Sequence, residues 1–331
     1  MRGWLKDRTS GEALTLPAYP PRRPPGSCSH FSASVVSAYQ NFIAFRRTLP
    51  RTPRLERQIV RARGITFAVF TSPFVQGTPP LVCVNGGMLY DHSMLWPALS
   101  PLAARRQIIL YDQRGRGQSS APADPSSASI DDDAADVGAL RRALGIRQWD
   151  VLGHSWGGGI SLLGTASDRA GVRRLVLVDP VSSTSAWMPI LRAAVLARLH
   201  GERRDAVAHI SEKSLEAQDP ALHSRYSRAV YPAWFADNEM AARFAPPDAI
   251  SVTGAAILGR LRRGYDWRDR LRALSVPTLV IHGESDPLPL ADFATDPYML
   301  SAARTIVVPS SGHMPFWEAP QRFFELIESF L

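Results

Sequence analysis

The chain has 331 residues, 45% of them hydrophobic, which is enough to bury one large core or two smaller ones. Its net charge of +8 and isoelectric point near 10.0 raise the question of a nucleic-acid partner. However, residues 1–64 carry 12 basic and three acidic residues, whereas the rest carries 26 and 27. The nearly neutral body argues against a basic binding face, and we expect no nucleic-acid partner.

The basic N-terminal extension, residues 1–54, is rich in proline, and we expect disorder to about Ser29. Its Arg22–Arg23 pair precedes a moderately apolar segment, Phe31–Phe45, which polar residues interrupt. We expect this segment to form a helix over the edge of the core rather than an export signal. No later stretch is long enough for a membrane span, so we predict a cytoplasmic protein without stable membrane insertion.

The two cysteines, Cys28 and Cys83, are too few for a disulfide framework, and Cys83 lies in an apolar run typical of a buried thiol. The sequence contains no H-E-x-x-H or C-x-x-C motif. We therefore expect no metal and no cofactor.

The predicted core begins with two antiparallel strands, Arg57–Arg63 and Ile65–Thr71, joined by a tight turn at Gly64. Short, continuous apolar runs follow, as in parallel strands buried on both faces. These runs are Leu81–Val84, Gln107–Tyr111, Trp149–Leu152 and Leu175–Val178, with further strands expected at Thr278–His282 and Thr305–Val308. Helical patterns separate them, so the sequence predicts an α/β fold with a mostly parallel central sheet.

Three helical regions complete this prediction. Ser129 can cap a helix whose first turn carries Asp131–Asp133 and whose end carries basic residues, an arrangement that suits the helix dipole. An amphipathic helix over Pro320–Leu331 closes the chain. Residues 181–267 contain helical patterns and many aromatics but no clear strand, and we predict an inserted helical cap there, with the core formed by 55–180 and 268–331.

The pentapeptide Gly153–Gly157 has the pattern G-x-S-x-G, after an apolar run and before a helix-like segment. A serine hydroxyl is a weak nucleophile that needs exposure, a nearby base and donors for an oxyanion. A sharp turn between a strand and a helix would expose Ser155, and its glycines would avoid clashes at a strained backbone. Ser155 is therefore the predicted nucleophile.

The base and the acid are expected in loops that follow later strands. His313, in Ser310–Pro315, comes after the last predicted strand and is the predicted base. We expect His154 to shape the turn instead. Asp286 is the predicted acid that orients the histidine, and Asp179 is its strongest competitor.

Two backbone amides should face the developing oxyanion. The amide of Trp156, directly after the nucleophile, is one. The other is expected from the glycine-containing loop after the first parallel strand, with Gly87 preferred and Met88 as the alternative.

Five motifs in this order resemble the α/β-hydrolase superfamily, and more narrowly the proline-iminopeptidase-like serine hydrolases. They are Asn85–Gly87, Tyr111–Ser119, Gly153–Gly158, Asp286 in an HGxxD-like loop, and Ser311–His313. The resemblance spans about Leu55–Leu331. It implies that the Asp112–Ser119 loop packs under the site as scaffold, and it implies a serine mechanism because relatives with an aspartate nucleophile differ at position 155.

One departure affects the expected substrate. Iminopeptidases of this family usually have His-Gly-Gly-Pro-Gly at the oxyanion loop, whereas this chain has Asn-Gly-Gly-Met-Leu at 85–89. An aminopeptidase also needs carboxylates to pair with the substrate ammonium, for which Glu239 and Asp237 are the candidates and Glu202 is an alternative. Met88 and Trp187 are further expected substrate contacts.

We predict a serine hydrolase that cleaves an ester of a small, mostly apolar molecule. The alternatives are a proline-iminopeptidase-like aminopeptidase and a non-hydrolytic acyltransferase, cyclase or ligand-binding protein on the same fold.

Overall fold

The computed structural model describes residues 37–331, except for 212, 218, 250, 273 and 295–299. The segment expected to be disordered, which ends at about Ser29, therefore lies outside the described residues. Cys28 lies in the same part of the chain. The central feature is one eight-stranded sheet with the order β1-β2-β4-β3-β5-β6-β7-β8. Its strands are β1 (Glu56–Ala62), β2 (Ile65–Thr71), β3 (Leu81–Val84), β4 (Ile108–Tyr111), β5 (Trp149–His154), β6 (Val172–Val178), β7 (Thr278–Gly283) and β8 (Ala303–Val308).

The sheet is mostly parallel, as predicted. Strand β2 pairs antiparallel with both β1 and β4, and every pair from β4 through β3 to β8 is parallel. Each predicted strand is present. Strand β6 begins at Val172, which pairs with Trp149 of β5, and so starts before the apolar run at Leu175. Arg173 within it pairs with the buried carboxylate of Asp150 on β5, with 2.9 Å between Nε and Oδ1.

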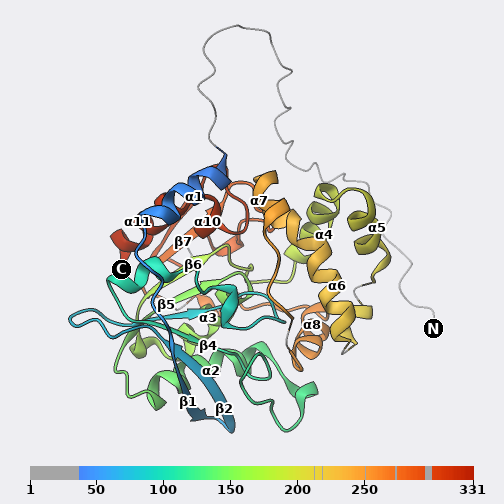
Figure 1. The fold of residues 1–331 in the computed structure, drawn as a ribbon. Coiled ribbons are helices and arrows are strands. Elements are labelled where there is room, and N and C mark those ends of the chain that lie inside the picture. Colours follow the sequence, from blue (N-terminus) through green and yellow to red (C-terminus); the bar gives the residue numbers. More distant parts are fainter. Residues whose placement is uncertain (1–36, 212, 218, 250, 273, 295–299) are drawn as a thin grey trace, which may run out of the picture. The chain divides into compact units, whose positions relative to one another are not determined.

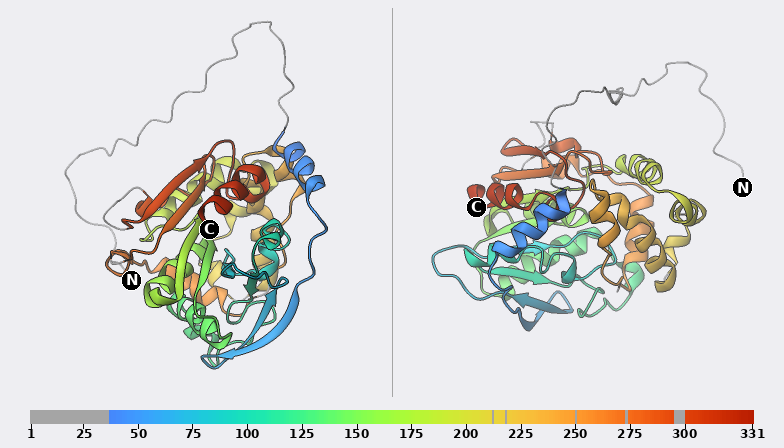
Figure 2. Two further views of the ribbon diagram at one scale, coloured as in Figure 1. Left: turned by 90° about the vertical axis from the view of Figure 1, so that its left-hand side faces the viewer. Right: turned by 45° about the horizontal axis from the view of Figure 1, so that its top comes forward.

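Helices cover both faces of the sheet (Figures 1 and 2). Along β3, Val82 and Val84 pack into one core layer, and Leu81 and Cys83 pack into the other. The first layer includes α2 (Ile130–Ala143) and α3 (Trp156–Ser167), and the second includes α11 (Pro320–Phe330). Burial on both faces explains why the parallel strands are apolar without alternation.

The interval between β6 and β7 is helical in its described part. It contains α4 (Trp187–Arg198), α5 (Gly201–His209), α6 (Pro220–Val230), α7 (Asn238–Arg243) and α8 (Gly254–Arg262), followed by α9 (Arg268–Leu271). Helices α4, α5, α6 and α8 gather on one side of the sheet (Figure 1). We call α4–α8 the cap helices.

The N-terminal helix α1 (Ala38–Thr48) falls partly within the expected Phe31–Phe45 helix and packs on α7 and on α10 (Pro315–Glu318). The ring of Phe42 lies 5.2 Å from that of Trp317 and 5.6 Å from that of Phe244. Ser37 caps α1, and its hydroxyl donates to Glu239 at 3.0 Å. The helix thus covers the outer side of α7 and α10.

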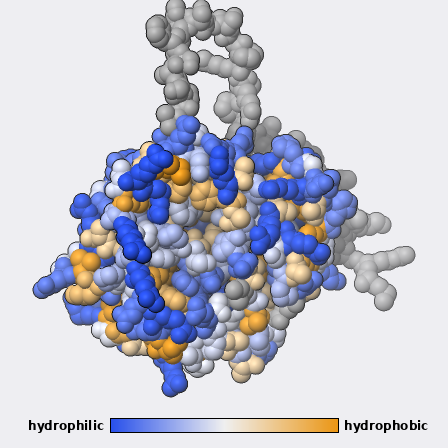
Figure 3. Space-filling view, in the orientation of Figure 1, coloured by the Kyte–Doolittle hydropathy of each residue, from blue (hydrophilic) through white to orange (hydrophobic). Residues whose placement is uncertain are grey.

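Surface hydropathy is mixed on the face drawn in Figure 3, where small apolar groups lie scattered among hydrophilic side chains. Among the described helices, none combines the length and hydropathy that a membrane crossing requires.

Phe323 on α11 offers a test of the second core layer. Its side chain is fully buried, with ring centroids 5.8 Å from Phe316 and 5.1 Å from Phe324. We expect Phe323→Ala to lower the free energy of unfolding by about 3–5 kcal/mol, measured by urea denaturation, because it leaves a cavity. The control is Gln321→Ala on the exposed face of α11, which should change that free energy by less than about 0.5 kcal/mol. Equal effects would contradict the packing.

Candidate active site

Ser155 lies at the sharp turn between β5 and α3, with φ of 54° and ψ of −121°. This conformation is unfavourable for a residue with a side chain, and the neighbouring glycines allow the packing that maintains it. A Cβ at Gly153 would lie 2.4 Å from the carbonyl oxygen of Gly157, and a Cβ at Gly157 would lie 2.2 Å from that of Val84. The strained turn predicted from the pentapeptide is therefore present.

His313 follows β8, and its Nδ1 donates a hydrogen bond of 2.7 Å to Oδ2 of Asp286, which follows β7. The backbone amide of Leu288 donates to the other oxygen of Asp286 at 2.8 Å. Burial lowers the pKa of His313 to about 3, so the ring is neutral at pH 7. With Nδ1 carrying the proton, Nε2 has the lone pair that a base requires.

Asp179, the competitor for the acid, lies against Asp286 instead of against the Nδ1 of His313. One of its oxygens accepts from the amide of Gly283 at 2.8 Å, and its side chain hydrogen-bonds to that of Asp286. Burial raises the pKa of both carboxyl groups, and their hydrogen bond raises that of Asp179 further while it lowers that of Asp286. Within this pair Asp179 therefore binds a proton more readily than Asp286, which favours Asp286 as the acceptor for His313.

The predicted oxyanion loop, Asn85–Met88, follows β3 and contacts the turn at Ser155. A Cβ at Gly86 would lie 2.7 Å from that of Ser155, so the two backbones are in close contact. Gly87 has φ of 68°, which favours glycine. Trp156 is the first residue of α3, where a backbone amide has no acceptor within the helix.

A cavity of about 240 Å³ joins these groups to the cap helices. Gly87, Ser155, Trp156 and His313 line it, as do the predicted substrate contacts Met88 and Trp187. Apolar side chains from α4, α6 and α8 form much of the remaining wall, including Leu191, Val195, Val230, Leu258 and Leu261. Among the described lining residues there is no Asp or Glu, and the basic ones are Arg192, Arg262 and the histidines.

Glu239, the predicted partner of a substrate ammonium, does not line the cavity. It lies on α7, where it accepts a hydrogen bond from Ser37 at 3.0 Å and pairs with Arg243 at 3.0 Å. The prediction placed Glu239 in the site from its neighbours in the sequence. The side chain instead points toward α1, and a contact of Glu239 with a substrate stays a prediction.

Two residues that sequence reasoning did not assign hold the histidine loop. The buried carboxyl of Glu318 accepts from the amide of Gly312 at 2.6 Å, and from those of Ala236 and Asp237 at 2.7 and 3.0 Å. Burial raises its pKa to about 7. The Trp234 carbonyl accepts from the amide of His313 at 2.8 Å, and the two rings lie 4.4 Å apart. The sequence feature that could have identified Glu318 is the presence of an acidic residue shortly after the Ser311–His313 motif.

Within the described part of the chain, three groups of side chains have potential metal-ligand atoms within 4.8 Å of one another. They are His154 with Asp179 and His313, Asp91 with His92 and Asp112, and Asp179 with His282 and Asp286. Hydrogen bonds already engage several of these groups, including His92 with Asp112 at 2.8 Å. The expected absence of a metal and a cofactor stays a prediction.

Comparison with known proteins agrees with this architecture. The profile of the alpha/beta hydrolase fold family matches residues 79–320. A proline iminopeptidase of Lactobacillus helveticus is 27% identical over 76% of this chain and 90% of its own. A 2-hydroxymuconate semialdehyde hydrolase of Pseudomonas putida is 32% identical over 68% of this chain and 77% of its own. The structure of an esterase from Exiguobacterium antarcticum superposes with a TM-score of 0.59 at 20% identity, covering 83% of this chain and 99% of that esterase.

His154 provides a test of burial at the site. Its Nε2 donates to the carbonyl of His313 at 3.0 Å, and burial lowers its pKa from 6.5 to about 3. Between these values the unfolded chain binds a proton that the folded one does not, so the contribution of His154 to stability falls as the pH falls. His154→Gln, which cannot titrate, should weaken this dependence by up to about 1.4 kcal/mol per pH unit. Urea unfolding at about pH 7, 6 and 5 measures it, and parallel profiles would contradict it.

Proposed function

The chain belongs to the α/β-hydrolase family, and on that basis we propose that it is a serine hydrolase cleaving an ester of a small, mostly apolar substrate. One observation carries this proposal. Ser155 and His313 line the same apolar cavity, and His313 is oriented by Asp286 on the side away from its free nitrogen. A nucleophile, a base and an orienting acid are the groups that acyl transfer to a serine requires.

In the first half of the reaction, the Ser155 oxygen attacks the ester carbonyl carbon while Nε2 of His313 takes the hydroxyl proton. Asp286 accepts from Nδ1 throughout and stabilises the charged imidazolium. The amides of Gly87 and Trp156 donate to the oxyanion of the tetrahedral intermediate. Collapse of that intermediate breaks the ester C–O bond, and His313 returns the proton to the leaving alcohol.

In the second half, water attacks the acyl-enzyme and His313 takes its proton. The acid is released and the Ser155 hydroxyl is restored. Because burial lowers the pKa of His313, its ring is neutral when each cycle begins.

The lining of the cavity favours an ester with an apolar acyl group. A substrate ammonium would enter a wall that, in its described part, offers arginines but no carboxylate, and an unpaired buried cation is costly. An uncharged acyl chain, in contrast, would pack against Leu191, Val195 and Leu258.

The second candidate is an aminopeptidase that removes an N-terminal residue. The similarity to proline iminopeptidases over 76% of this chain favours it. Against it stands the position of Glu239, whose carboxylate pairs with Arg243 outside the cavity.

A panel of short acyl aryl esters and aminoacyl arylamides, including Pro-arylamide, distinguishes the candidates. We expect ester turnover to exceed arylamide turnover by at least about tenfold. Ser155→Ala should abolish both turnover and covalent labelling by a fluorophosphonate probe without changing the unfolding midpoint. Labelling of Ser155→Ala equal to that of the wild type would refute the nucleophile. Transfer of the acyl group to added alcohols in preference to water would favour the acyltransferase.

The two buried aspartates should differ in their importance for turnover. Asp286→Asn loses the carboxylate that orients His313, so we expect kcat to fall by about 10³–10⁴-fold, as for triads in general. Asp179→Asn replaces a neutral carboxylic acid with a neutral amide that can still donate to Asp286, and kcat should change by less than about tenfold. Steady-state kinetics at pH 7 measures both variants. The reverse order would assign the acid role to Asp179.

A further inference from the structure

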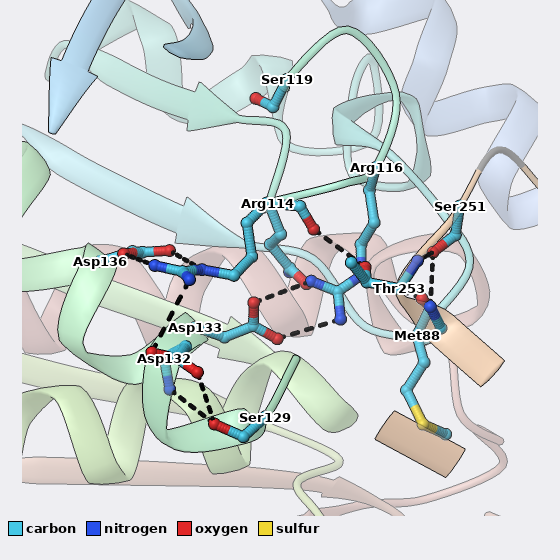
Figure 4. A network of polar contacts seen from close by, with 12 residues as sticks. Met88, Arg114, Arg116, Ser119, Ser129, Asp132, Asp133, Asp136, Ser251 and Thr253 are labelled. Atoms are coloured by element: carbon cyan, nitrogen blue, oxygen red, sulfur yellow. Dashed lines mark hydrogen bonds and ion pairs between the residues drawn. The ribbon is translucent and has the colours of Figure 1, made fainter. Parts of the chain in front are cut away.

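Arg116 lies in the loop between β4 and α2, and its guanidinium donates hydrogen bonds to two partners (Figure 4). Both terminal nitrogens donate to the Asp133 carboxylate at 3.0 Å, and Nε donates to the carbonyl of Met88 at 2.9 Å. The arginine is 1% exposed and its partner is equally buried. Because both terminal nitrogens bind one carboxylate, the plane of the guanidinium is restricted. The direction in which the Nε–H points is restricted with it.

Met88 is the residue at which this contact reaches the oxyanion loop. On the other side of the Gly86–Gly87 pair, Nε2 of Gln113 donates to the carbonyl of Asn85 at 2.9 Å. Side chains of one loop therefore hold the carbonyls on both sides of the two glycines. Since glycine restricts the backbone least, these external contacts determine where the loop amides lie.

The same loop also contacts the start of cap helix α8. The amide of Val252 donates to the carbonyl of Gly115 at 2.9 Å, and the Thr253 hydroxyl donates to that of Arg114 at 3.0 Å. Gly254 lies so close to Met88 that a Cβ there would be 2.7 Å from the Met88 carbonyl oxygen. This carbonyl is thus enclosed by Arg116 and by the entry to α8 (Figure 4).

We propose that Arg116 is a positioning residue. It holds the Gly86–Met88 backbone in the position from which the Gly87 amide can donate to the oxyanion. The inference rests on the proposed serine hydrolase function. Donors to an oxyanion act through preorganisation, so a loop free to shift stabilises the transition state less. Arg116 acts only through the loop, and its loss should reduce kcat more than it changes KM.

Arg114 supplies a matched control two residues away. It is also buried and pairs with a carboxylate of α2 through two bonds of 2.6 Å to Asp136. Its guanidinium also lies 3.7 Å from Asp132 and contacts that helix rather than Met88. Removal of the Arg114–Asp136 pair deletes a buried ion pair, together with the bond of 2.9 Å from the more exposed Arg63 to Asp136, but leaves the bond to the oxyanion loop.

The test compares two double variants of the full chain, Arg116→Met with Asp133→Leu and Arg114→Met with Asp136→Leu. Both replace an ion pair with apolar side chains, which avoids an orphaned buried charge. For the first we expect kcat on an aryl ester to fall on the order of 10- to 100-fold with KM within about threefold. Inhibition by a trifluoromethyl ketone, which forms a tetrahedral adduct, should weaken by a similar factor. The second should change kcat by less than about threefold.

Amide hydrogen exchange of the peptide covering residues 85–91 gives a readout that does not depend on activity. Exchange should be faster in the Arg116→Met, Asp133→Leu protein and unchanged in the Arg114→Met, Asp136→Leu protein. Arg116→Lys, which keeps the charge but loses the fixed fork of donors, is a milder variant in case the first does not fold, and it should shift kcat and exchange in the same direction.

Equal losses in the two double variants, or unchanged exchange at residues 85–91, would overturn the positioning role. A wild-type protein without Ser155-dependent turnover would instead overturn the proposed function. The exchange comparison alone would then decide whether Arg116 holds the loop.

Discussion

The backbone of Ser155 has φ of 54° and ψ of −121°, a conformation that costs of order 1–3 kcal/mol and persists only where packing enforces it. Here the packing comes from the close contacts of α3 with β5 at Gly153 and with β3 at Gly157, where no Cβ fits. The parallel sheet aligns the carboxyl ends of its strands. The loops after β3, β7 and β8 therefore lie at the same edge of the sheet as Ser155.

Burial determines the electrostatics around the turn. It lowers the pKa of His313 and raises those of Asp179, Asp286 and Glu318, so the uncharged forms are favoured throughout this part of the site. Hydrogen bonds then decide which group keeps charge. Their mutual hydrogen bond raises the pKa of Asp179 and lowers that of Asp286, which favours Asp286 as the acceptor for the imidazole. The two carboxyl groups thus differ in their contacts, Asp286 with the imidazole and Asp179 with the amide of Gly283.

Elements far apart in the sequence meet at this cluster. Glu318 holds the histidine loop to the segment that precedes α7, and α1 packs on the outer side of α7. On the opposite side, the Asp112–Ser119 loop contacts both the oxyanion loop and the start of α8. The cap helices are therefore connected to the two loops on which the proposed chemistry depends, in addition to forming the wall of the cavity.

Local patterns in the sequence were sufficient to predict the strands of the sheet, because strands buried on both faces form continuous apolar runs. They were also sufficient to predict the strained turn, because only its glycines permit the close packing. They did not determine partners distant in the chain. Asp133 at the start of α2 suited the helix dipole, yet it pairs with buried Arg116, and Glu239 pairs with Arg243 beside α1 rather than facing a substrate. The prediction of Asp286 over Asp179 as the acid stays a prediction, and its support from the structure is the contact of Asp286 with His313. Hydrophobic periodicity and turn chemistry act between neighbours in the sequence, whereas charge pairing and burial depend on which segments the folded chain brings together.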